Sequence, residues 1–272
     1  MSTKTKANTE NQAVETTTQA PKGRQIQTKF RVAILNKSGN VGKTTISRHL
    51  LAPRMEGYED IIYIETLNAD DETKNGKRLH SAQFEKLAHK MIQSVSSIID
   101  VGSSNLEQTL ELMRQIEGSH EDLDYIIVPT TKLPKQRADT ISTIAELVAM
   151  GIEPEKIKVV YNQVGLLEDV NEDFSDLIFA MNKLNIKHNP DAVIYLNNFF
   201  PSFLDTGKTL DTLFTPSIED NKARQDDLRR MELRTDEETK ALRDLSKIIT
   251  LQRNALSAIT NLDNVYEALF TE

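Results

Sequence analysis

The chain has 272 residues, of which 38% are hydrophobic and 27% charged, and its formal net charge is −8. This length suits one large domain, or a domain with an appendage, and it is sufficient to bury a sizeable core. The acidic balance gives the whole chain no general attraction to nucleic acid or anionic lipid, so such a contact would need a local basic patch. The absence of cysteine excludes disulfides and thiolate metal sites.

The first 28 residues are rich in Thr, Gln, Asn and Lys and contain almost no large apolar side chains. We expect a disordered polar tail over 1–28, with brief contact with DNA as the alternative to a purely solubilising role. No apolar stretch approaches the ~20 residues of a membrane span. The N-terminus also lacks the apolar core of a signal peptide, so we expect a cytoplasmic protein without membrane contact.

From residue 30 onward, apolar runs of strand length alternate with helix-like stretches. The strand-like runs are 31–36, 60–65, 95–100, 124–128, 157–162 and 192–196, and the helix-like stretches are 43–54, 81–93, 104–117, 136–150 and 170–184. This alternation predicts an α/β domain over 29–215, with a doubly wound, mostly parallel sheet and helices on both faces. Such sheets bind ligands at the carboxyl ends of their strands.

Residues 216–272 differ in composition from the rest of the chain. A highly charged connector leads to Thr235-Asp-Glu-Glu238, which is a capping box, and a long stretch with helical apolar spacing follows. We predict a long C-terminal helix that either packs on the domain or binds a partner. Arginines 224, 229, 230 and 234 alternate with acids, which favours a solvated face over a DNA-binding patch.

The segment 36–45 is the most informative part of the chain. An apolar run ends there in a small-residue loop that reads Ser38-Gly39-Asn40-Val41-Gly42-Lys43-Thr44-Thr45, and a helix-like pattern follows at once. Strand, loop and helix in this order are the context of a phosphate-binding loop. The loop N–H groups and the helix N-terminus would bind phosphate oxygens.

Lys43 and Thr44, near the end of this loop, have distinct expected roles. We expect Lys43 to reach the β- and γ-phosphates, and to face solvent in the empty protein, while the Thr44 hydroxyl binds Mg²⁺. The common pattern has a glycine six residues before the lysine, and Lys37 stands there instead. A second Gly-Lys-Thr at 207–209 has no strand before it, so the short motif alone is not specific.

Polar side chains also end three other predicted strands. Asp100 follows a buried run and precedes a glycine turn, which is typical of a carboxylate that holds Mg²⁺ through a water. Glu65, Asp70 or Asp71 could position or deprotonate an attacking water, and a solvated loop acid is the alternative for each. Asn162 could hydrogen-bond an adenine edge or could serve as a turn asparagine.

Over about residues 30–215 the chain resembles the deviant-Walker ATPases of the ParA/MinD superfamily. The resemblance is carried by residues 36–45, Asp100-x-Gly102, Pro129, Asn162 and Gly207-Lys208-Thr209-Leu210. It implies an enzyme that binds ATP with Mg²⁺, dimerises face to face on ATP and is reset by hydrolysis to ADP. It also implies a plasmid-encoded DNA-binding adaptor as partner and a role in segregating or positioning plasmid DNA.

This chain departs from the family pattern at two places. The family has a second loop lysine where Ser38 stands here, and that lysine reaches the phosphates of the partner subunit. Lys37 either performs this role from a shifted position or the contact across the dimer is lost. The closely spaced aspartates of the family are replaced by Glu65 and Asp70.

Two other functions remain as alternatives to this ATPase. One is a small-molecule kinase or ATP-dependent ligase, and the other is a static ATP-binding module.

Overall fold

The structure is a computed structural model that describes residues 26–64, 93–116, 118–204 and 210–271. Its centre is a six-stranded, all-parallel sheet in the order β2-β3-β1-β4-β5-β6. The strands are β1 (Arg31–Ile34), β2 (Ile61–Ile64), β3 (Ser97–Val101), β4 (Tyr125–Thr130), β5 (Ile157–Val164) and β6 (Val193–Tyr195). The predicted fold class is confirmed, and each strand overlaps one of the apolar runs that predicted it.

Helices occupy most of the connections between the described strands and also the region after β6. They are α1 (Lys43–Thr45), the π-helix η1 (Ile46–Leu51), η2 (Ser103–Asn105), α3 (Leu106–Gln115), α4 (Pro134–Ala149), η3 (Pro154–Lys156), α5 (Val170–Asp173), α6 (Ser175–Lys183), α7 (Phe199–Leu204), α8 (Leu210–Leu213), α9 (Ile218–Arg230) and α10 (Asp236–Phe270). The helix expected over 81–93 lies outside the described residues except for its last position.

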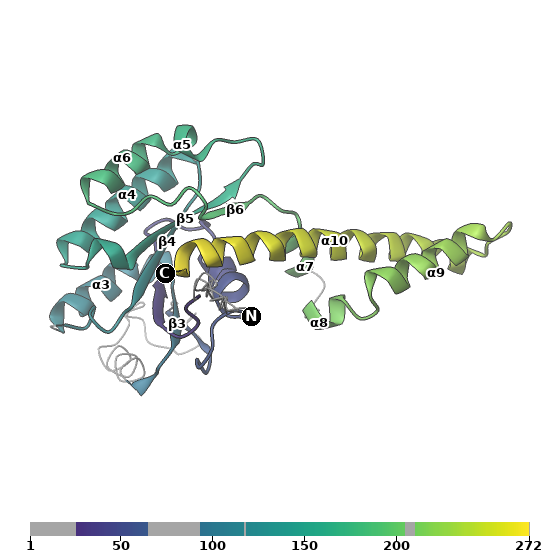
Figure 1. Cartoon of the computed structure of the whole chain (residues 1–272), viewed down its shortest axis with the longest axis horizontal. Coiled ribbons are helices and arrows are strands. Elements are labelled where there is room, and N and C mark those ends of the chain that lie inside the picture. Colours follow the sequence, from purple (N-terminus) through teal and green to yellow (C-terminus); the bar gives the residue numbers. More distant parts are fainter. Residues whose placement is uncertain (1–25, 65–92, 117, 205–209, 272) are drawn as a thin grey trace, which may run out of the picture.

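The helices cover both faces of the sheet (Figure 1). On one face, α3, α4 and α6 bury a cluster that includes Leu110, Ile144 and Leu177. On the other face, η1 and the C-terminal part of α10 bury a second cluster that includes Leu50 and Tyr266. The sheet is therefore apolar on both sides, which explains why its strands are continuous apolar runs rather than alternating ones.

The order of the strands determines where a ligand can bind. β1 lies in the centre, with β3 on one side and β4 on the other. The order in which successive strands are added to the sheet therefore switches from one side of β1 to the other. In register, Ile34 at the end of β1 pairs with Asp100 of β3 and with Ile127 of β4. The segment after β1 and the carboxylate of Asp100 therefore meet at one point of the carboxyl edge, which is the usual binding position in such folds.

The charged stretch 216–235 is not only a connector, since it contains helix α9. The hydrophobic pattern did not predict this helix, because its buried face includes two polar side chains, Asn221 and Gln225. These donate to Gln252 (3.2 Å) and to Ser246 (2.8 Å) of α10. Helices α9 and α10 form a hairpin that projects from the domain (Figure 1).

The long helix α10 begins where the capping box predicted. The Thr235 side chain accepts from the Glu238 N–H, and the Glu238 carboxylate accepts from the Thr235 N–H at 2.8 Å. Its first half pairs with α9, while its second half packs Leu262, Val265 and Leu269 against the sheet. Among the described residues, no helix is both long and apolar enough to span a membrane.

Candidate phosphate-binding site

The loop between β1 and α1 turns sharply at Gly42. This residue has φ of +92°, a conformation that side chains with a Cβ rarely adopt. A Cβ at this position would lie 2.0 Å from Nδ2 of Asn162, so the close approach of the Asn162 side chain also requires glycine at position 42. Gly42 precedes the first residue of α1, and the free N–H groups at the start of that helix lie next to the loop.

Asn36 fixes the start of the loop. Its side chain is fully buried, and its amide donates to the Pro129 carbonyl and to the Thr140 hydroxyl, both at 2.8 Å. Its oxygen accepts from the Ser38 N–H at 2.7 Å. One side chain therefore joins the loop to β4 and α4.

Lys43 is folded back over its own loop. Its Nζ donates to the Ser38 carbonyl at 2.9 Å and contacts the Asn36 carbonyl at 3.4 Å. The side chain is only 9% exposed, so the expectation of a solvent-facing lysine is wrong for this structure. Burial lowers the pKa of Lys43, and the charge of Asp100 opposes that shift. The loop carbonyls satisfy this ammonium where phosphate oxygens would replace them.

Lys37 points toward α4. Its backbone N–H donates to the Thr143 hydroxyl at 3.2 Å. Its Nζ donates to the Ser142 hydroxyl at 2.9 Å and lies 2.9 Å from a carboxylate oxygen of Glu146. The other oxygen of Glu146 lies 2.6 Å from Arg114 of α3. The two cations hold the pKa of Glu146 below its usual value, because both donate hydrogen bonds to the charged form.

Asp100 lies at the floor of the site, 3% exposed, at the end of β3. Its carboxylate accepts from the Ser47 hydroxyl at 2.9 Å, and Ser47 also lies 3.2 Å from the Thr44 carbonyl. Thr44 itself is exposed on the first turn of α1. The expected magnesium pair therefore lies on two neighbouring elements, and Ser47 connects them.

Asn162 contacts the loop directly. Its amide donates to the Val41 carbonyl at 2.8 Å, and its oxygen accepts from the Gln163 N–H at 2.9 Å. The side chain is 4% exposed. These contacts make Asn162 a support for the loop, while its expected role at an adenine edge stays a prediction.

The described residues include most of the predicted site. Ser38 and Val41 are buried, Gly39 and Asn40 are exposed at the loop tip, and Thr45 is partly buried. Glu65 and Asp70 lie outside the described residues, as do Asp71 and the second Gly-Lys-Thr at 207–209. Their roles stay predictions.

The sequence pattern did not predict the side chains that hold the loop in place. Besides Asn36, these are Ser47 and three residues on one face of α4, namely Gln136, Thr140 and Thr143, of which Gln136 donates to the Gly39 carbonyl at 3.2 Å. Threonines 140 and 143, spaced three residues apart near the start of a predicted helix, are a weak sequence signal for such a contact. Their pairing with the loop over about a hundred positions had no signal in the sequence.

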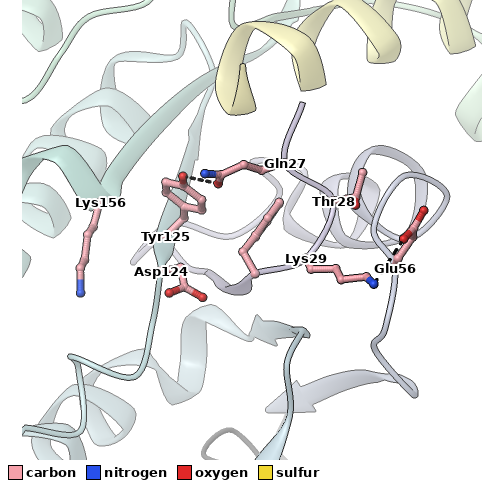
Figure 2. Close-up of a pocket in the computed structure, with 8 residues that line it drawn as sticks. Gln27, Thr28, Lys29, Glu56, Asp124, Tyr125 and Lys156 are labelled. Atoms are coloured by element: carbon pink, nitrogen blue, oxygen red, sulfur yellow. Dashed lines mark hydrogen bonds and ion pairs between the residues drawn. The ribbon is translucent and has the colours of Figure 1, made fainter. Parts of the chain in front are cut away.

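A separate hollow of about 650 Å³ lies at the opposite, amino-terminal edge of the sheet (Figure 2). Its lining carries both charges, from Lys29, Glu56, Asp124 and Lys156, and Tyr125 donates to Gln27 there at 2.7 Å. Lys29 and Glu56 pair with each other at 3.8 Å. This hollow is not part of the candidate site, since the loop and Asp100 lie at the carboxyl edge.

No protein-family model matches the sequence, and no curated protein matches it. Among solved structures, apo McdA of Cyanothece is similar, with 17% identity, coverage of 84% of this chain and 99% of that chain, and a TM-score of 0.39. The ATP complex of a Cyanothece McdA variant is similar at 13% identity, with coverage of 82% and 97% and a TM-score of 0.39. Likenesses at this level do not decide what this chain does.

Proposed function

We propose that this protein is a Mg²⁺-dependent ATPase of the ParA type, which converts ATP to ADP and phosphate and dimerises on ATP. The observation that carries the proposal is the loop 36–45. It lies between a central strand and a helix at the switch point of the sheet, with its lysine beside a strand-end aspartate. Positioning and charge stabilisation by a phosphate loop and its lysine are what phosphoryl transfer requires of a protein.

The residues at the loop fit a magnesium ion. Thr44 offers an exposed hydroxyl and Asp100 a buried carboxylate, and oxygen donors are the ligands that Mg²⁺ prefers. The described residues contain no group of three or more metal-binding carboxylate, histidine or cysteine side chains, but a phosphate-loop site needs none, because substrate phosphates and water complete the shell. The ion would neutralise charge on the phosphates, and Ser47 would keep Asp100 oriented.

Exposed leucines support dimerisation through the carboxyl edge of the sheet, where the phosphate loop also lies. Leu133, Leu166, Leu167 and Leu196 follow β4, β5 and β6 and are 58%, 78%, 102% and 65% exposed. Their loops are tied together by the Lys132–Glu168 ion pair and by a bond of 2.8 Å from the Leu196 N–H to the Val164 carbonyl. Exposed apolar side chains on connected loops at one edge of the sheet favour an interaction site there.

The biological role that we propose follows from the resemblance of the motifs rather than from the fold. Within the ParA group, we infer from these motifs a resemblance to the plasmid stability protein StbB. We infer a role in plasmid stability or positioning with a plasmid-encoded DNA-binding adaptor. Non-specific DNA contact by the chain itself is a further part of this proposal, and the overall net charge of −8 restricts it to a local patch.

Sedimentation velocity of the full chain tests the proposal. A non-hydrolysable ATP analogue with Mg²⁺ should convert monomer to dimer, ADP should not, and ATP should be hydrolysed without any added acceptor. Lys43→Ala should abolish binding and hydrolysis, and Leu167→Lys should bind the analogue as a monomer. Binding without dimerisation or turnover would instead indicate a static ATP-binding module, and turnover only with an added acceptor would indicate a kinase or ligase.

A further inference from the structure

The loop residue Lys37 is held in an ion cluster that also contains Glu146 and Arg114. Glu146 binds the two cations through different oxygens, Lys37 at 2.9 Å and Arg114 at 2.6 Å. The carboxylate is neither deeply buried nor free, with a side-chain exposure of 23%, and Lys37 is 28% exposed. The cluster therefore lies at the surface of the domain beside the phosphate loop.

The charges in this cluster do not balance. Two cations share one carboxylate, so the departure of Lys37 would leave Glu146 and Arg114 as a neutral pair. The backbone of Lys37 is fixed independently, since its N–H donates to Thr143. Only the side chain would have to move, and the other partner it would leave is a serine hydroxyl on the surface. A partly exposed ion pair of this kind is weak compared with a contact between an ammonium and a phosphate.

We propose that Glu146 is a positioning residue that competes with nucleotide phosphates for Lys37 and thereby regulates the phosphate site. In this structure, Glu146 holds the ammonium on α4. When phosphates occupy the loop, or when those of a second subunit arrive, Lys37 exchanges the carboxylate for phosphate. Arg114 keeps Glu146 paired after the exchange. This inference rests on the proposed nucleotide binding and adds the residue that controls the lysine.

Competition for Lys37 predicts opposite changes in affinity for the ATP analogue when Glu146 and Arg114 are replaced. Glu146→Gln releases Lys37 and should tighten binding of a fluorescent, non-hydrolysable ATP analogue about three- to fivefold, the range expected for a partly exposed pair. Arg114→Gln leaves Lys37 as the sole counter-ion of Glu146 and should weaken binding. A purely structural role would instead shift both variants in the same direction, because each change removes one bond from the same cluster.

The test uses the full chain with analogue titration and sedimentation on the same samples. Glu111→Gln is the matched control, because Glu111 is exposed on the same helix as Arg114 and makes no ion pair among the described residues. Glu146→Gln should have no effect in a Lys37→Ala background, whether Lys37 serves its own nucleotide or that of a partner. Thermal melts of each variant verify that it is folded.

Two results would overturn the inference, and they are distinguishable. If the wild type binds the analogue but Glu146→Gln acts equally with and without Lys37, or Arg114→Gln tightens binding, the competition is absent and the proposed function stands. If the folded wild type binds no analogue, the proposed function and this inference both fail.

Discussion

Replacing Asn36 by alanine tests whether one buried amide holds the phosphate loop. The change removes three hydrogen bonds, two at 2.8 Å and one at 2.7 Å. Thr140 keeps a partner, because its hydroxyl also donates to the Gln136 carbonyl at 2.7 Å. The Ser38 N–H and the Pro129 carbonyl lose theirs in a buried place. At about 1 kcal/mol for each bond, the free energy of unfolding should fall by about 3 kcal/mol.

Urea unfolding followed by circular dichroism measures this change, with an unchanged m-value as the sign that only stability moved. For a chain of this size, the same loss should lower the melting temperature by about 6–12 °C. Asn182→Ala, on the exposed face of α6, is the control and should alter stability by less than about 0.5 kcal/mol. A loss below about 1 kcal/mol for Asn36→Ala would refute the reasoning, because the loop would then be held by other contacts.

Three further changes test the site and its surroundings. Gly42→Ala should cost about 1–2 kcal/mol for the left-handed backbone alone. It should also abolish nucleotide binding, because its Cβ would displace Asn162, whereas Gly39→Ala, whose Cβ would lie 3.6 Å from the nearest atom, should bind normally in the same titration. Asp100→Ala should retain part of the nucleotide affinity but lose its Mg²⁺ dependence; an unaltered Mg²⁺ effect in paired titrations would assign the metal to another acid. Burial lowers the pKa of His188 below its usual 6.5. Protonation of His188 is therefore less favourable in the native state than in the unfolded chain, so the free energy of unfolding should decline as the pH falls below 6.5. His188→Gln should reduce this decline in urea unfolding measured between pH 7.5 and 5.5, and an unchanged slope would contradict the assignment.

The sequence alone determined the sheet, the loop and the start of the last helix. Continuous apolar runs of strand length can only be buried on both faces, so they predicted the parallel sheet. The loop 36–45 was recognisable because close backbone approach needs glycine and the residue types follow the chain order. Local chemistry also determined the capping box of α10, since Thr235 and Glu238 lie three residues apart.

The tertiary structure alone decided which side chains hold the site. Asn36 contacts Thr140, and the Lys37 N–H contacts Thr143, across about a hundred positions, and a single sequence contains no signal for such a contact. Lys43 was expected in solvent but is buried, because the loop offers its own carbonyls as acceptors. Helix α9 was not predicted for a related reason. Its buried face includes the polar side chains Asn221 and Gln225, and their burial is favourable only because Gln252 and Ser246 of α10 accept their hydrogen bonds. The spacing of apolar residues along the sequence indicates which faces of an element are buried, whereas the pairing of polar groups depends on which segments the fold brings together.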